Sequence, residues 1–126
     1  MIHEDYLMRQ IQIMVAFIAK MIFKKDTINY TVIKDENGNI TQDGELYLDL
    51  MSRIKRGEIN EAENILFEAV KKNPNNALLE IALDFYSELG EISDEFLIEN
   101  NFSKEEVCQG LCDILKIYNI DLLQVI

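Results

Sequence analysis

The sequence predicts an all-α protein of five or six helices, and three observations lead to this prediction. The 126-residue chain has one proline and five glycines, so few residues interrupt a helix. Apolar residues recur at spacings of three and four along most of its length. Capping residues and helix stops separate these runs. A hydrophobic content of 48% can build one core, and we expect residues 1–126 to form a single helical domain.

The first helix is expected over residues 4–24. Its apolar residues run nearly all the way round, which indicates burial across the later helices. Between Ile13 and Phe23 only Lys20 is charged, and these eleven residues are too few for a membrane span, which needs about 20. Glu4 and Asp5 precede the apolar run and no small-residue cleavage site follows it, so we expect neither a membrane span nor a secretory signal.

Charge is divided unevenly between this helix and the rest of the chain. The net charge is -11, and residues 1–25 contain the only net-basic element, with Arg9, Lys20, Lys24 and Lys25. One interpretation is a helix that lies on anionic lipid. We favour a core or dimer helix, because an apolar surface all round indicates burial. Two states remain open: a homodimer through this helix, or a monomer that buries it fully.

Residues 26–45 break the helical pattern. A small hairpin or an extended excursion is expected at 27–42, because Ile28, Tyr30 and Val32 alternate with polar residues before a turn-forming run of Asp, Asn and Gly. The spacing of that run is similar to the start of a calcium loop. Ile40 and Leu46, however, occupy the positions where such a loop needs glycine and a bidentate glutamate, which argues against calcium binding.

Two helices are expected next, paired antiparallel. The first begins near Asp43 and stops at Gly57. The second begins near residue 61, with Asn60 and Glu63 as a variant capping box, and ends near residue 73 before Pro74. Its apolar stripe consists of Ala62, Ile65, Leu66, Ala69 and Val70.

The remaining helices follow from similar signals. The most apolar of them starts after Asn76 and is expected to be central, with Gly90 as its end. Ser93 opens a short helical turn, and Ser103 with Glu106 forms a capping box for the last long helix. The tail from residue 121 to residue 126 is apolar enough to dock on the body.

The helix pair around Gly57 resembles one tetratricopeptide repeat. Gly57, Ala62, Ala69 and Pro74 stand at the offsets of that family, with Leu66 at the large apolar site. The resemblance covers one repeat, and its second half matches best. Since repeat arrays need about three units for stability, we expect tetratricopeptide-like helix hairpins within a closed small domain. The start and layout of the chain also resemble a group of short bacterial proteins of unknown function.

The repeat resemblance implies a peptide groove lined by the first helix of each pair. The residues at groove-facing offsets are Tyr47, Met51, Lys55, Ile81, Phe85 and Glu88. Four of these are apolar or aromatic, unlike the Lys and Asn that clamp a C-terminal carboxylate in such families. An alternative is that the protein's own first helix fills the groove.

No set of residues in the sequence suggests catalysis or a cofactor. The chain has one histidine, no Gly-rich phosphate loop and no Gly-x-Ser-x-Gly motif, so we expect no enzymatic activity. Cys108 and Cys112 are four apart on one helix, but zinc would need two further ligands, and we expect a pair of small buried side chains. Reduced thiols and no signal peptide favour the cytoplasm.

Two classes of function are compatible with this sequence. The acidic composition argues against nucleic-acid binding, because phosphate neutralisation needs clustered basic residues. We favour a non-enzymatic protein-interaction or regulatory module that binds a protein or peptide partner. The alternative is a small-molecule- or metal-binding protein, which would need a polar constellation inside a pocket.

Overall fold

The computed structural model describes the backbone of residues 2–121 and the side chains of residues 6–121, so the predicted docking of the tail lies outside the described residues apart from Asp121. Within this part the chain is all-α. Its six α-helices are α1 (Ile2–Ile18), α2 (Gln42–Lys55), α3 (Ile59–Lys72), α4 (Asn76–Glu91), α5 (Asp94–Glu99) and α6 (Lys104–Ile117). A π-helical turn, η1 (Ala19–Phe23), continues α1. The predicted fold class is confirmed.

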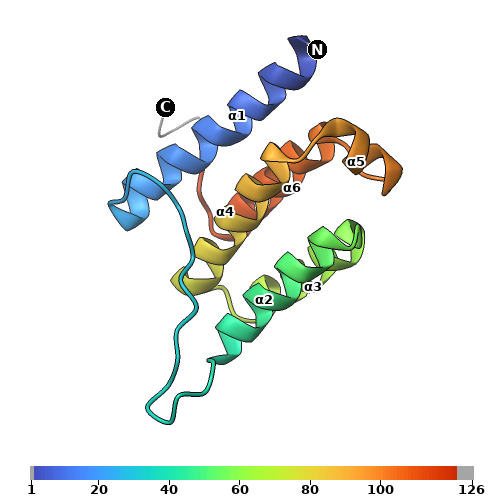
Figure 1. Cartoon of the computed structure of the whole chain (residues 1–126). Helices are drawn as coiled ribbons and strands as arrows, with labels where there is room; N and C mark the ends of the chain where they lie inside the picture. The colour runs from blue at the N-terminus through green and yellow to red at the C-terminus, as the bar shows by residue number, and fades with distance from the viewer. Residues whose placement is uncertain (1, 122–126) are drawn as a thin grey trace.

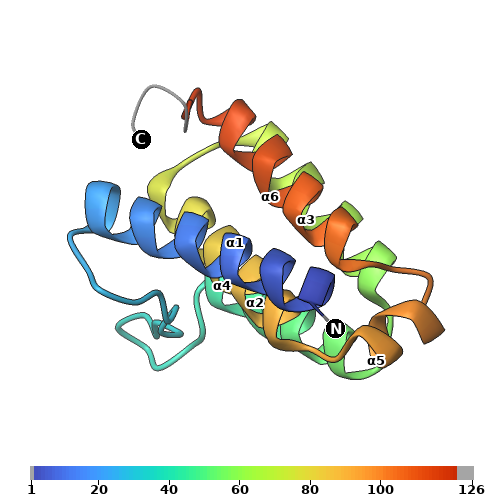
Figure 2. The same ribbon diagram turned by 90° about the horizontal axis from the view of Figure 1, so that it is seen from above.

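The helices form three layers (Figure 1). The pair α4 and α6 lies in the middle, the hairpin of α2 and α3 packs on one side of it, and α1 packs on the other side. Seen from above, α1 is the outermost helix (Figure 2). The expected packing of the first helix across the later ones is therefore confirmed, and its support is α4 with α6.

Only one side of α1 is buried. Ile11 and Ile18 are fully buried against the body, whereas the side chains of Tyr6 and Ile13 are 57% and 56% exposed. Of the two states left open by the sequence, a monomer that buries this helix fully is not what the structure has, because the middle layer covers a single face of the helix. η1 ends at Phe23, and the next residue, Lys24, adopts a left-handed backbone conformation.

The sequence analysis counted eleven residues between Ile13 and Phe23, too few for a membrane span, but the apolar helix formed by α1 and η1 together is longer. The 18 residues Tyr6–Phe23 are long and apolar enough to cross a membrane by length and composition, and 22% of them are buried in the structure. The same property is found in core helices of soluble proteins and in signal sequences. Arg9 and Lys20 lie within this window.

The α2–α3 hairpin has a turn that requires glycine. Gly57 has a φ of +81°, and a Cβ atom there would lie 2.3 Å from the side-chain oxygen of Asn100. The start of α3 differs from the prediction. The helix begins at Ile59, and no side chain caps it. The capping-box prediction was wrong because Asn60 donates to the carbonyl of Asn101 and Glu63 accepts the hydroxyl of Tyr86.

α4 is the central helix, as predicted, and contacts α1, α2, α3 and α6. Gly90 does not end it. The helix continues to Glu91, and Gly90 lies where α1 crosses, since a Cβ there would be 3.0 Å from Ile11 Cγ2. The C-terminus of α4 is capped from a distance. The buried ammonium of Lys104 donates to the carbonyls of Leu89, Gly90 and Ile92, which satisfies groups that a helix end leaves unpaired.

The last two helices start as predicted. The hydroxyls of Ser93 and Ser103 accept backbone N–H bonds from Phe96 and Glu106, both at 3.2 Å. α6 approaches α3 and α4 closely at Gly110, where a Cβ would meet both the Glu63 carboxylate and the Tyr86 hydroxyl.

Residues 24–41, which we call the connecting segment, join η1 to α2 in extended conformation. An isolated β-bridge pairs Lys34 with Ile40, so within the described chain the expected hairpin is reduced to its tip. Asp35 Oδ1 accepts the N–H groups of Asn37 and Asn39, and this fixes the turn. From η1 the segment descends past α4 toward the start of α2 (Figure 1).

Candidate functional site

A row of carboxylates follows α4 on the side that the connecting segment crosses. Asn75 starts this helix by accepting the N–H of Leu78 at 2.9 Å. From that start, Glu80, Asp84 and Glu88 are four residues apart and therefore share one face. The first two contact the connecting segment, and Glu88 is exposed.

Asp84 is the centre of the site. Its side chain is 6% exposed, which is unusual for a carboxylate. Oδ2 accepts the backbone N–H of Tyr30 at 2.7 Å and the hydroxyl of Tyr47 at 3.1 Å. Burial raises the pKa of Asp84, although both hydrogen bonds act in the opposite direction. One carboxylate thus ties the connecting segment to α2 and α4 together.

Tyr30 is the aromatic anchor of the connecting segment. Its ring lies 4.9 Å from the ring of Tyr47, measured between centroids, and its side chain is 9% exposed. Ile28 is also buried, whereas Asn29 and Thr31 are exposed, which is the alternation of an extended chain lying on a surface. Burial and the Asp84 carboxylate raise the pKa of Tyr47 to about 12, so this hydroxyl remains a donor at neutral pH.

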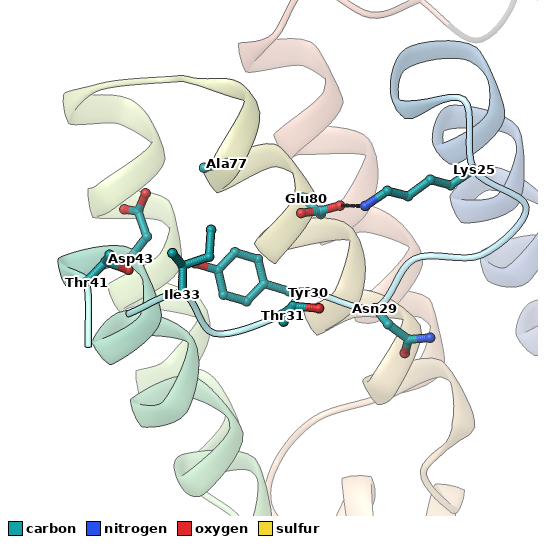
Figure 3. Close-up of a pocket in the computed structure, with 9 residues that line it drawn as sticks. All are labelled: Lys25, Asn29, Tyr30, Thr31, Ile33, Thr41, Asp43, Ala77 and Glu80. Carbon is teal, nitrogen blue, oxygen red and sulfur yellow. Dashed lines mark hydrogen bonds and ion pairs between the residues drawn. The ribbon is translucent and has the colours of Figure 1, made fainter. Parts of the chain in front are cut away.

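Two depressions flank the anchor. The first has a volume of about 340 Å³ and lies between the connecting segment, α2 and α4 (Figure 3). Lys25 closes one edge of it through an ion pair of 2.8 Å with Glu80. The second, of about 280 Å³, lies between α1, the connecting segment and the later part of α4. Its acidic wall includes Asp26, Glu88 and Glu91.

The six residues predicted to line a groove have different environments. Tyr47 lies in the site, and Met51 packs half-buried against the core. Ile81 and Phe85 have 0% exposure and belong to the core, so they do not line an open groove in this structure. Lys55 is exposed on α2, and Glu88 is exposed beside the second depression. Peptide binding by this set stays a prediction.

The segment that covers the α2–α4 face is not the predicted one. The first helix was offered as the element that fills the groove, but α1 packs on α4 and α6. The connecting segment covers the face instead, through Tyr30 and Lys25. The physical reason is that the apolar side of α1, with Ile11 and Ile18, is buried against two helices, whereas an extended chain with one buried side is enough to cover the contact between α2 and α4.

The sequence analysis missed Asp84 and Tyr30 as partners. Asp84 was assigned to the polar edge of its helix, and a single sequence contains no signal that pairs it with a residue 54 positions away. The alternation of Ile28 and Tyr30 was visible, and it indicated an extended stretch with one buried side.

Metal chemistry finds little support in the described residues. No group of three or more His, Cys, Asp or Glu side chains there is placed to hold a metal ion. Cys108 and Cys112 are half-buried free thiols on α6, and burial raises the pKa of both, which disfavours the thiolate that binds metals. The turn at Asp35 uses its carboxylate for backbone bonds.

Comparison with known proteins gives one match. The model of a family of unknown function (DUF6483) matches residues 1–119. No curated protein and no solved structure matches the chain. The match agrees with the resemblance to short bacterial proteins of unknown function, and the tetratricopeptide resemblance stays a prediction.

Proposed function

Because the chain belongs to the DUF6483 family, whose function is unknown, we propose its role from its own contacts: a non-enzymatic protein-interaction module. In this proposal the α2–α4 face binds an extended polypeptide, and the connecting segment occupies that face in the absence of a partner. The role is regulatory in the sense that an internal segment and an external one compete for the same contacts.

One observation carries the proposal. The connecting segment is itself an extended polypeptide bound to this face, held by a backbone N–H to the buried Asp84 carboxylate and by the packing of Tyr30 on Tyr47. A backbone hydrogen bond is available to any extended chain, and an aromatic side chain on a fixed ring provides selectivity. The tetratricopeptide resemblance supports the same proposal, because it implies a groove lined by the first helix of each pair, and these helices would be α2 and α4.

The same contacts define the chemistry of the partner. The face offers Asp84 and Glu80 from α4 and a tyrosine ring from α2. A matching segment is extended, carries an aromatic residue and has a basic residue a few positions before it. Lys25 and Tyr30 of the connecting segment have this arrangement. A net charge of -11 on the whole protein favours a basic partner further.

A synthetic peptide with the sequence of residues 24–34 tests the proposal in trans. The receiver is an isotope-labelled Tyr30→Ala variant, whose own segment has lost its anchor. We expect saturable amide shifts at Tyr47 and Asp84, with half-saturation below that of the unmodified protein. In the unmodified protein the attached segment competes with the peptide at an effective concentration on the order of millimolar, so more peptide is needed for half-saturation.

Two controls accompany this titration. A peptide carrying Tyr30→Ala should produce no saturable shifts. An Ile33→Ala receiver, changed at a 58% exposed position of the same segment, should behave as the unmodified protein does. Equal responses to both peptides, or no saturable shift in the Tyr30→Ala receiver, would contradict the proposal.

The first depression favours a second candidate, a small-molecule-binding protein. Its volume of about 340 Å³ is at the lower end of ligand sites, which start near 300 Å³, and the Lys25–Glu80 ion pair provides polar groups at its edge. Native mass spectrometry of protein purified without additives separates the two candidates. A stoichiometric retained ligand would make the small-molecule function the primary one.

A further inference from the structure

α1 and the start of η1 carry a regular stripe of side chains that points mostly away from the body, with Phe17 at its edge packing partly against the core. Tyr6, Arg9, Ile13, Phe17 and Lys20 follow one another at spacings of three, four, four and three, so they share one face of the helix, which we call the outer stripe. Tyr6, Arg9, Ile13 and Lys20 are exposed and Phe17 is half-buried. The stripe therefore contains three aromatic or aliphatic groups and two cations, one cation toward each end.

The stripe is complementary to itself when two copies run antiparallel. If Ile13 lies on a two-fold axis, position 6 of one copy faces position 20 of the other, and position 9 faces position 17. Each cation then lies against an aromatic ring, Lys20 on the partner's Tyr6 and Arg9 on the partner's Phe17, and Ile13 meets the partner's Ile13. Cation–π pairs of this kind are attractive at exposed sites.

Charge along the helix favours the same direction. The first turn of α1 contains the acidic positions 4 and 5 of the sequence, and its far end carries Lys20 and Lys24. Antiparallel pairing brings the acidic end of one copy beside the basic end of the other, and it also opposes the two helix dipoles. Parallel pairing would place like charges together at both ends.

A membrane is a less suitable cover for this surface. A helix of α1 and η1 that spanned a membrane would place Arg9 and Lys20 within the hydrocarbon region, where charged side chains are unfavourable. It would also remove Ile11 and Ile18 from the core, where both have 0% exposure. Residues 26–126 are strongly acidic, which opposes contact with anionic lipid.

We propose that the outer stripe of α1 is the interface of an antiparallel two-fold dimer of this chain, centred on Ile13. One helix pair buries less than the roughly 1,600 Å² of a standard interface, so we expect an association that responds to dilution. The α2–α4 face lies away from this interface, and both copies keep it available.

Sedimentation velocity of the full chain over a dilution series measures the association. The unmodified protein should change from dimer to monomer on dilution. Ile13→Lys places two ammonium groups on the axis and should weaken the dimer about 100-fold. Gln12→Lys, at an exposed neighbouring position off the stripe, is the matched control and should leave it unchanged. Unaltered melting temperatures for both variants show that the fold is kept.

Cysteine cross-linking tests the register. In a background in which Cys108 and Cys112 are replaced by serine, Ile13→Cys should form a disulfide-linked dimer under mild oxidation, because the axis passes through it. Tyr6→Cys should not cross-link with itself, but should do so when mixed with Lys20→Cys. Strong self-linking of Tyr6→Cys indicates a parallel pair and overturns the proposal.

Two further results would also overturn it. One is a monomer mass at every concentration of the unmodified protein. The other is flotation of the full chain with vesicles of anionic phospholipid that is lost in Ile13→Lys, since the stripe would then be covered by lipid. Absence of flotation together with dimerisation supports the proposal.

Discussion

Replacement of Asp84 by alanine should release the connecting segment and leave the helical body folded. The Asp84 carboxylate is 6% exposed and joins three parts of the chain, because it accepts from Tyr30 of the segment and from Tyr47 of α2. The other polar tie of this stretch of the segment to α4 is the ion pair between Lys25, half-exposed, and Glu80. Such an exposed pair contributes less than about 1 kcal/mol.

The magnitude follows from the hydrogen bond between the backbone N–H of Tyr30 and Asp84, which is the one that opening of the segment breaks. Each hydrogen bond to a charged group contributes about 1.5–3 kcal/mol, and a buried N–H left without an acceptor costs about 1–3 kcal/mol. The loss is partly offset, because alanine removes a carboxylate whose burial is unfavourable, as its raised pKa indicates. We therefore expect the free energy of opening of the segment to fall by about 2 kcal/mol, which corresponds to about a 30-fold increase in the open population.

Limited proteolysis with trypsin measures this opening, since Lys25 and Lys34 lie within the segment. Cleavage after these residues should accelerate about 30-fold in Asp84→Ala while circular dichroism stays helical, because cleavage follows the open population. Glu88→Ala is the matched control, with the same charge removed one turn later at an exposed position of α4. Equal cleavage rates in Asp84→Ala and Glu88→Ala would refute the assigned role of Asp84.

Two further predictions concern buried charges elsewhere. Lys104→Met keeps the length of the side chain but removes the ammonium that caps α4, so the free energy of unfolding in denaturant titrations should fall by about 3 kcal/mol. The control is Lys116→Met at an exposed position of α6, which should change that free energy by no more than about 0.5 kcal/mol. Burial raises the pKa of Glu63 and of Asp84, so the folded chain holds protons more tightly than the unfolded chain. The resulting stability is present below the ordinary carboxyl pKa of about 4 and is lost as the pH rises through the raised values, so the melting temperature should be higher near pH 5 than near pH 7. The double variant Glu63→Gln with Asp84→Asn should reduce that difference. A melting temperature that rises with pH over this interval would contradict the assignment.

The helices could be predicted because their signals are local. Ser93 and Ser103 were recognised as caps, and Gly57 as a stop, from neighbours within four positions along the chain. Hydrophobic periodicity placed α4 at the centre because its apolar residues leave only a narrow polar edge. These signals need no knowledge of what the helix packs on.

The predictions were wrong where a residue that fits a local role, such as a helix cap or a helix stop, contacts a residue far away in the sequence instead. Asn60 and Glu63 have the spacing of a capping box, but tertiary contacts with Asn101 and Tyr86 displaced that role. Gly90 has the position of a helix stop, yet it permits α1 to cross closely. In both cases the residue type was informative, but the reason for that residue type is a contact between elements far apart in the sequence.

The candidate site depends on such distant contacts throughout, which explains why only Tyr47 among its central residues was identified in advance. The sequence analysis did contain a usable signal, since Ile28 and Tyr30 alternate with polar residues as a half-buried extended chain does. In the described structure no strand pairs with this stretch along its length, so its backbone needs other acceptors. A buried carboxylate on this helix is a suitable acceptor, and Asp84 is the one acidic residue of α4 that is buried. An extended, alternating stretch without a pairing strand, together with one acidic residue on the apolar side of the most apolar helix, is therefore a combination that predicts a chain bound to a helical face.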